Sequence, residues 1–382
     1  MAKNIISADK IFDGFKWLIE KALVIEDGII LDIIDKNGIE NVQHFEGILT
    51  PGFINCHCHT ELSHMKNVIP EATGLMGFVG KIMQLRQYSE EEIKSACASA
   101  LEEMQKNGIV AVGDICNTTH SLDAKTNSNL EFQNFIELAG FLPEQASPRF
   151  ENGEKIAAQF EKTGATSIVP HAPYSVSKDL FEKINAYSQD KIISIHNEET
   201  PDENLLYEKK EGVFLDLYKK MNANIDFFQP TGKTSLQSVL PYLNKPSQIL
   251  LVHNSFTSES DIQFAENQAK NTHQQIYWTL CPNANWYIER TIPPVDVLRK
   301  NRVKITLGTD SIASNYSLNI LSEIHRLQKH FPNIPQEEYL QWATSNGAAA
   351  LGMQEQLGTF SIGKKPGINL ISKDFQTIKK LY

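Results

Sequence analysis

Eight short apolar segments, separated by stretches with helical spacing, recur along most of this 382-residue chain. They cover residues 52–57, 108–115, 130–138, 166–171, 191–196, 248–253, 275–281 and 303–310. Residues 89–108 show the intervening pattern: Ser89 and Glu92 form a capping-box motif, apolar residues follow at helical spacing, and Asn107-Gly108 supplies a stop. Because strands that alternate with helices form parallel sheets, this pattern predicts an α/β fold. Eight such strands favour a closed (β/α)8 TIM barrel over an open sheet.

The two ends of the chain depart from this alternation. Residues 1–50 and 353–382 show short strand-like runs separated by turn signals such as Glu26-Asp27-Gly28, and residues 357–375 read as strand, Gly-rich turn and strand. We therefore expect residues 1–50 and 353–382 to build one small β-sandwich beside a barrel formed by residues 51–352. The segment 197–247 is polar in places and is expected to mix a loop with helices.

The composition argues against several classes of partner. A net charge of −10 disfavours binding to nucleic acid or to an anionic membrane. No stretch approaches the length of an apolar membrane span, and the first residues lack the pattern of a secretion signal. The five cysteines are scattered and odd in number, which is not typical of a disulfide framework. These features predict a cytoplasmic protein that acts on a small molecule, and they leave a homodimer open.

The first of the eight segments ends in an unusual cluster, PGFINCHCHTELSH at residues 51–64. On a strand, side chains alternate between two faces, so His57 and His59 point one way and Cys56 and Cys58 the other. The carboxyl end of a barrel strand opens into the active site, so the histidines are expected to face the mouth. A mixed Cys/His zinc site would need both faces at once, and we therefore interpret the cysteines as small buried residues.

Metal-capable residues also end later apolar segments. His171, His196 and His253 each close one segment, and Asp310 closes the last. A single histidine at a strand end is usually an ordinary polar residue. Five strand ends with such residues, all at the same rim of a barrel, predict side chains that converge on one metal-binding centre.

As a set, these motifs resemble the amidohydrolase superfamily, and within it the zinc-dependent deaminases of purine-like and triazine-like rings. The motifs are PGFINCHCH, VPHAPYSVS, IHNEET, LVHN, CPNANWYI and LGTDSIASN. Two-metal members of the family usually carry a bridging lysine at the end of the fourth strand, whereas this chain has PHAP at 170–173. The resemblance therefore implies one divalent metal ion per chain, Zn2+ first with Fe2+ or Mn2+ as substitutes. By the same resemblance, its ligands are His57, His59, His196 and Asp310.

The resemblance also implies the catalytic residues of a hydrolytic deaminase. A bound zinc ion lowers the pKa of its water from about 15.7 to about 7, so that hydroxide becomes available to attack the ring carbon. Glu199, three residues after His196, is expected to carry protons from this water to the ring nitrogen and to the departing ammonia. His253 is expected to hold or deprotonate the water beside Asp310, which doubles as ligand and base. Glu198 is expected to point away.

Four residues are expected on the substrate side of the site. His171 is expected to hydrogen-bond the substrate from the rim. Glu61 shares the strand face of His59 if the extended geometry continues, and it is expected to accept hydrogen bonds from ribose hydroxyls or a ring. The alternative for Glu61 is a solvated loop carboxylate. Ser314 and Asn315 are expected to orient the seventh and eighth loops around the substrate.

The segment 59–86 is similar to the aminodeoxyfutalosine deaminase group, whose substrate is an adenine nucleoside with a 5′ aryl-carboxylate arm on the menaquinone route. The first candidate substrate is therefore 6-amino-6-deoxyfutalosine. The alternatives are adenosine, methylthioadenosine, S-adenosylhomocysteine, guanine, a pterin-like ring, a cyclic amide or a chlorinated ring, and a metal-free relative without activity. A carboxylate arm needs a cation, for which Arg149, Arg290 and Lys66 are candidates. Residues 65–85 and 116–130 are candidate lid segments.

Overall fold

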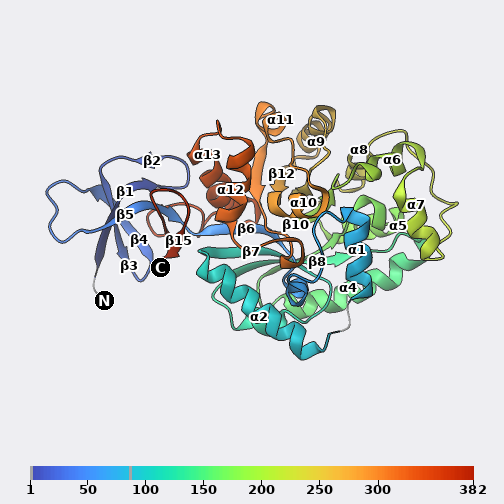
Figure 1. Cartoon of the computed structure of the whole chain (residues 1–382), viewed down its shortest axis with the longest axis horizontal. Coiled ribbons are helices and arrows are strands. Elements are labelled where there is room, and N and C mark those ends of the chain that lie inside the picture. Colours follow the sequence, from blue (N-terminus) through green and yellow to red (C-terminus); the bar gives the residue numbers. More distant parts are fainter. Residues whose placement is uncertain (1–2, 86–87) are drawn as a thin grey trace.

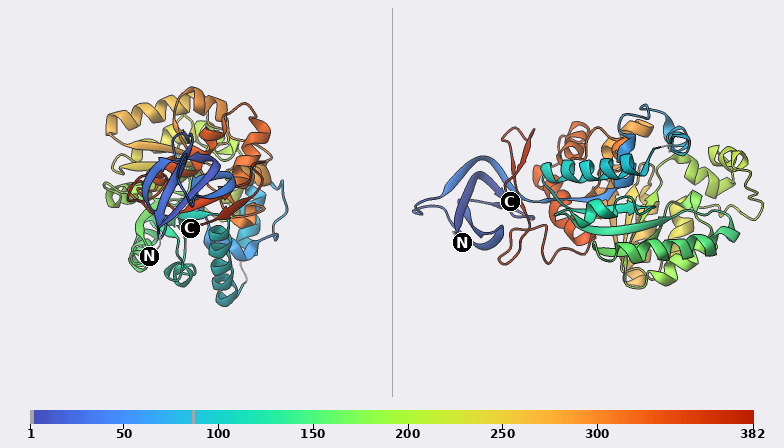
Figure 2. Two further views of the ribbon diagram at one scale, coloured as in Figure 1. Left: turned by 90° about the vertical axis from the view of Figure 1, so that its left-hand side faces the viewer. Right: turned by 90° about the horizontal axis from the view of Figure 1, so that it is seen from below.

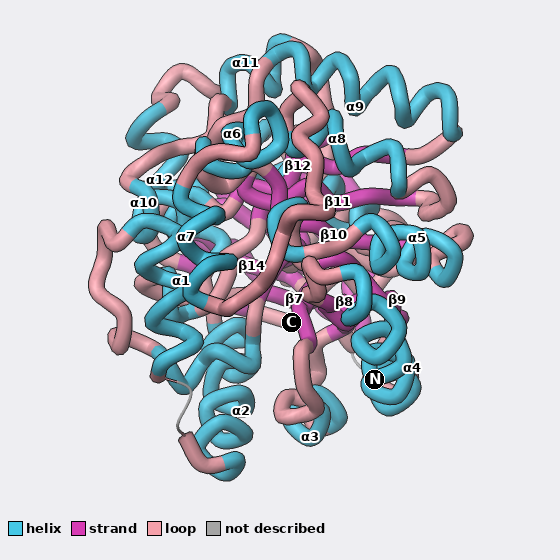
Figure 3. Tube along the Cα trace, turned by 90° about the vertical axis from the view of Figure 1, so that its right-hand side faces the viewer, coloured by secondary structure: helices cyan, strands magenta, loops and turns pink. Residues whose placement is uncertain are grey.

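The computed structural model describes residues 3–85 and 88–382, and its larger part is a (β/α)8 barrel (Figure 1). Its parallel strands are β6 (Phe53–Cys58), β7 (Ile109–Cys116), β8 (Glu131–Leu138), β9 (Ala165–Pro170), β10 (Ile192–Asn197), β11 (Gln248–His253), β12 (Gln275–Leu280) and β13 (Lys304–Leu307). Figure 3 shows these strands in the middle of the molecule with helices around them. The eight apolar segments coincide with the eight strands, and this confirms the predicted fold class.

Ladder hydrogen bonds divide the barrel into two four-stranded halves, β6–β9 and β10–β13. Backbone hydrogen bonds beyond the strand ends join the halves at both seams. At one seam His196 N donates to His171 O over 2.9 Å. At the other, Thr309 N and Asp310 N both donate to His57 O over 3.0 Å. Both seams therefore run through residues that the sequence assigns to the metal centre or its rim.

The helices cover the outside of the barrel, and α2 (Glu90–Lys106) confirms the predicted capping box. Ser89 Oγ accepts a hydrogen bond from Glu92 N, and Glu92 Oε2 accepts one from Ser89 N. The other α-helices are α1 (Gly74–Gln84), α3 (Leu122–Thr126), α4 (Ala146–Phe160), α5 (Lys178–Tyr187), α6 (Pro201–Lys209), α7 (Val213–Lys220), α8 (Ser235–Val239), α9 (Glu259–Thr272), α10 (Pro282–Glu289), α11 (Val295–Lys300), α12 (Ile320–His330), α13 (Gln336–Gln341) and α14 (Gly347–Ala350). Within the described ranges, none of the helices has the length and apolar character needed to cross a bilayer.

Both termini contribute strands to a second, smaller sheet at one end of the molecule (Figures 1 and 2). Its order is β15-β14-β5-β1-β3-β4, with β2 on β1. The strands are β1 (Asn4–Phe12), β2 (Trp17–Leu18), β3 (Lys21–Glu26), β4 (Ile29–Asp35), β5 (Gln43–Pro51), β14 (Ile368–Ile371) and β15 (Ile378–Lys380). Of the strand–turn–strand expected over 357–375, the second strand is β14, whereas the described residues before the turn form no strand; Phe360 nevertheless belongs to the apolar core of this sheet, with Ile6 and Leu23.

Candidate active site

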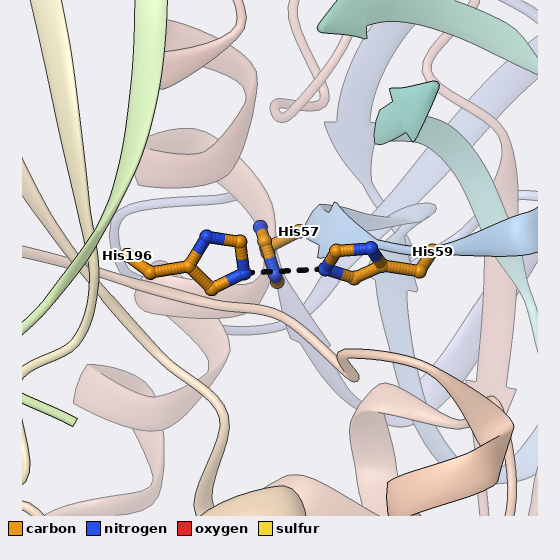
Figure 4. Close-up of side chains that lie close together, drawn as sticks. All are labelled: His57, His59 and His196. Carbon is orange, nitrogen blue, oxygen red and sulfur yellow. Dashed lines mark hydrogen bonds between the residues drawn. The ribbon is translucent and has the colours of Figure 1, made fainter. Parts of the chain in front are cut away.

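The four residues expected to bind a metal lie together at the carboxyl ends of the barrel strands. His57 belongs to β6 and His59 follows it, His196 belongs to β10, and Asp310 follows β13. The Nε2 atoms of His59 and His196 are 3.2 Å apart, and Figure 4 shows these two rings facing each other with His57 beside them. Asp310 Oδ1 lies 3.3 Å from His59 Nε2 and 3.6 Å from His57 Nε2. All four residues are buried, so they form one compact cluster.

The chemistry of this cluster fits a divalent metal ion. Both ring nitrogens of His57 are buried, and neither has a hydrogen-bond partner among the described residues, which is unfavourable unless a ligand binds there. Burial lowers the pKa of His57 and His59 and lowers that of His196 to about 4, so the rings are neutral and offer lone pairs. Burial alone raises the pKa of Asp310, but the neighbouring imidazoles hold it below its usual range. Three neutral imidazoles and one carboxylate suit Zn2+.

Contacts behind the ligands fix which atoms face the cluster. His196 Nδ1 donates to His171 O over 2.8 Å, and this leaves Nε2 free to bind a metal. Ser314 Oγ donates to Asp310 Oδ2 over 2.6 Å, and this leaves Oδ1 on the side of the histidines. His196 Nε2 and Asp310 Oδ1 are therefore held facing the cluster by neighbours outside the predicted ligand set.

The backbone at these strand ends is unusual. β13 ends at Leu307 rather than at 310 as expected, because the chain turns past β6 at Gly308. A Cβ at Gly308 would lie 2.8 Å from the Cβ of His57, so only glycine allows this close approach. His253 and Asp310 have φ angles of 74° and 55°. Such left-handed non-glycine residues are costly and cluster at functional sites.

The adjacent glutamates after β10 point in different directions. Glu199 is buried, lines the cavity beside the cluster, and places Oε1 3.7 Å from His253 Nε2. Glu198 instead accepts a hydrogen bond from Thr257 Oγ1 over 2.6 Å. Burial, and then the charge of Asp310, raises the pKa of Glu199 well above its usual value. The geometry therefore separates the two carboxylates in the manner that the sequence predicted.

His253 is oriented by a neighbour from α10. Asn285 Nδ2 lies 3.2 Å from His253 Nδ1 and donates to it, so the proton of the neutral ring lies on Nε2. Burial lowers the pKa of His253 well below its usual value, which favours this neutral form. The ring therefore presents an N–H donor towards Glu199 and the metal cluster.

Cys56 and Cys58 occupy the other face of β6, as the alternation predicted. Both are fully buried in the apolar core of the barrel. Burial raises the pKa of Cys56 to about 12 and raises that of Cys58 as well. Both residues are therefore neutral thiols that fill space between the strand and the outer helices.

A cavity of about 130 Å³ adjoins the cluster. Its polar side includes His59, His171, His196, Glu199, His253 and Asp310. Its apolar side is formed by Leu62, Leu75, Phe78, Val79, Ile82, Met83 and Ile288. Most of these apolar residues belong to α1, so the helix in the expected lid segment forms one wall of the cavity.

The residues expected to bind substrate do not all reach this cavity. His171 lines it, with Nδ1 bonded to Ser175 Oγ at 2.6 Å. In the part of the chain that the structure describes, Glu61, Ser314 and Asn315 are absent from the lining. Ser314 acts on Asp310, and Asn315 Nδ2 donates to Thr309 O over 2.7 Å, so both orient the eighth loop. Glu61 is turned to the loop after β7, where it accepts hydrogen bonds from backbone amides; extended geometry ends before it.

Several residues that line the cavity were not singled out from the sequence, and two of the polar ones lie near the ligand cluster's rim. Glu137 lies at the carboxyl end of β8, and Asn117 directly follows β7. The signal for Glu137 was present, because it is a carboxylate near the end of the third apolar segment, at the same rim as the ligands. Asn117 offers no comparable signal, because an asparagine after a strand is typical of any turn.

Known proteins of similar sequence and structure indicate the family of this chain. The model of the Amidohydrolase family matches residues 48–381. An adenosine deaminase of Helicobacter pylori is 26% identical over 363 residues, covering 87% of this chain and 85% of the relative. A 5′-deoxyadenosine deaminase of Methanococcus vannielii is 27% identical over 405 residues, covering 99% and 86%. The crystal structure of Helicobacter pylori aminofutalosine deaminase with methylthio-coformycin superposes with a TM-score of 0.83 at 25% identity, covering 97% of this chain and 92% of that one.

The chain belongs to the Amidohydrolase family, since the family model spans nearly all of it. Within that family it is a hydrolase that acts on carbon–nitrogen bonds. The four expected ligands fall into two groups of side chains whose ligand atoms lie close enough to hold a metal ion, His57-His59-His196 and His57-His253-Asp310, which favours a metal-binding member of the family.

Proposed function

We propose that this chain is a hydrolytic deaminase of an adenosine-type nucleoside and binds one divalent metal ion, Zn2+ first, at His57, His59, His196 and Asp310. One observation carries the proposal: the buried carboxylate of Glu199 faces His253 in the cavity next to the ligand cluster. Deamination needs a proton carrier at that position, whereas metal binding alone does not. The relatives named for adenosine and 5′-deoxyadenosine support the same substrate class.

The metal, when bound, supplies the Lewis acidity that brings the pKa of a water molecule close to neutrality. Glu199 takes the proton that this water loses as its oxygen bonds to the ring carbon, and Glu199 then passes the proton to the adjacent ring nitrogen. The Glu199 carboxylate then takes the remaining proton from the hydroxyl on the ring carbon and gives it to the amino group; the carbonyl forms as the carbon–nitrogen bond breaks, and ammonia leaves. Burial of Glu199 raises its pKa, which suits a group that must hold and release a proton in turn.

Other residues orient the reactants. His253 Nε2–H donates towards the attacking oxygen, and the Asp310 carboxylate accepts a hydrogen bond on the other side. His171 lies across the cavity, where its ring reaches the substrate from the rim. His253 and Asp310 are buried and His171 is partly buried, so these groups limit the access of bulk water to the reacting carbon.

For the particular substrate we propose 6-amino-6-deoxyfutalosine, with 5′-deoxyadenosine and methylthioadenosine as alternatives. The apolar wall from α1 supports a substrate whose 5′ side is apolar. Two of the expected cations are already engaged, since Arg290 pairs with Glu71 and Lys66 with Glu103. The third, Arg149, is exposed on α4, so the apolar wall supports the aryl part of the arm and, within the described residues, none of the three expected cations lines the cavity.

The proposal is tested by ammonia release from the metal-loaded protein. The candidate substrates are separated by a panel that contains adenosine, 5′-deoxyadenosine, methylthioadenosine, 6-amino-6-deoxyfutalosine, guanine and a chlorinated triazine. We expect the adenine nucleosides to be deaminated, with the apolar 5′ derivatives preferred over adenosine. Turnover of the triazine or guanine without turnover of any adenine nucleoside would contradict the proposal.

A further inference from the structure

Glu137 is a buried carboxylate that the mechanism above does not use. It lies on β8, is 8% exposed, and lines the cavity beside the ligand cluster. Its Oε2 accepts a hydrogen bond from Asn117 Nδ2 over 3.0 Å. Its Oε1 accepts none from the described residues. A buried carboxylate oxygen without a donor is unfavourable, so this atom indicates a missing hydrogen-bond donor.

The nearest candidate donor inside the protein is already used. His196 Nδ1 lies 3.4 Å from Glu137 Oε1. However, its proton is directed to His171 O at 2.8 Å. A ring N–H has one proton, so His196 does not satisfy Glu137 as well. The partner of Oε1 is therefore a group bound in the cavity: either a hydrogen-bond donor or a metal ion, since ligand atoms of Glu137, His171 and His196 lie within 4.8 Å of one another.

Hydrogen bonds from the loop after β7 fix the position of the Glu137 side chain. Asn117 Nδ2 holds Oε2, and the backbone amides of Asn117 and Thr118 donate to Glu61 Oε2 over 3.1 and 2.9 Å. Glu61 is itself buried. Glu61, which the sequence predicted to accept hydrogen bonds from the substrate, therefore fixes the loop after β7. That loop in turn holds the carboxylate of Glu137, which faces the cavity.

We propose that Glu137 accepts a hydrogen bond from a ribose hydroxyl of the substrate, so that it selects nucleosides over free bases. This inference rests on the proposed function. The ring nitrogens of adenine are hydrogen-bond acceptors. Its one donor group, the 6-amino group, lies at the reacting carbon. The 2′ and 3′ hydroxyls are the donors common to all the candidate nucleosides. An ionised carboxylate pairs with a hydroxyl donor and repels ring acceptors.

The test compares adenosine with 2′-deoxyadenosine, 3′-deoxyadenosine and 2′,3′-dideoxyadenosine in wild type, Glu137→Gln and Glu137→Asp. Glu137→Gln keeps an oxygen for Asn117, and Glu137→Asp keeps the charge but withdraws it by one methylene group. We expect each variant to lose about 10- to 100-fold in kcat/KM for adenosine, as for loss of one charged hydrogen bond. Wild type should lose a similar factor with dideoxyadenosine, whereas the variants should barely distinguish the two substrates.

Bound metal, measured by elemental analysis, is the second readout. It should be unchanged in both variants, and Glu131→Gln, on the exposed start of the same strand, should behave as wild type. Equal losses on adenosine and dideoxyadenosine, or loss of metal, would show that Glu137 supports His196 instead and overturn the inference. Wild-type protein that deaminates no nucleoside would fail at an earlier step, and would reject the proposed function together with this one.

Discussion

Glu198 and Glu199 are neighbours in the sequence, yet their carboxylates have different surroundings. Glu199 faces His253 in the cavity, whereas Glu198 bonds to Thr257 and Asn204. We predict that Glu199→Gln lowers kcat by about 10²- to 10⁴-fold, because an amide cannot carry the proton. It should retain metal, because Glu199 lies outside the proposed ligand set. The measurements are single-substrate kinetics and elemental analysis.

The matched control is Glu198→Gln. This change keeps one oxygen for its hydrogen bonds and leaves the cavity wall untouched, so turnover should stay within a few fold of wild type. If Glu199→Gln turned over normally, or if Glu198→Gln were the inactive variant, the assignment of the proton carrier would be wrong.

At the scale of the elements, a buried ion pair connects β7 and α3 to the metal centre. Lys125 Nζ lies 2.6 Å from Asp114 Oδ2, and both side chains are fully buried. Asp114 Oδ1 accepts hydrogen bonds from the backbone and hydroxyl of Thr60, the residue after His59. The Lys125–Asp114 pair therefore holds the end of β6 and, with it, the proposed metal ligand His59 in position.

We predict that Lys125→Met lowers the free energy of unfolding by about 3–5 kcal/mol, because it leaves the Asp114 charge buried without a partner. Adding Asp114→Asn should recover most of this loss, because the asparagine is neutral and keeps an acceptor for Thr60. Denaturant unfolding of the single and double variants gives both numbers. A double variant no more stable than Lys125→Met would show that the charge itself is not the cause.

The elements also show what could be read from the sequence. Strand positions and the faces of β6 were predictable, because burial on both sides of a parallel strand leaves an apolar run with polar residues at its end. Glu61 was misplaced because alternation was extended past Cys58, where the chain instead turns into a short helix, Thr60–Met65. Asn117 and Asn285 reach Glu137 and His253 only through tertiary structure, and no local pattern specifies such contacts.

At the scale of the whole molecule, the proposed ligands connect the two halves of the barrel. His57 and His59 come from the β6–β9 half, whereas His196 and Asp310 come from the β10–β13 half. One bound ion would therefore link both seams at once. Without it, three neutral imidazoles and a carboxylate remain buried together, with both His57 nitrogens lacking partners among the described residues.

We predict that removing the metal with a chelator lowers Tm by several degrees and that Zn2+ restores it. Binding to the folded state alone stabilises it by about 4 kcal/mol when free metal exceeds Kd by 1,000-fold. His196→Ala should remove this response, since it deletes a ligand, whereas His120→Ala, in the loop after β7, should respond like wild type. The measurement is thermal unfolding with chelator and with added Zn2+. An identical Tm in both conditions for wild type would mean that these four side chains do not share an ion.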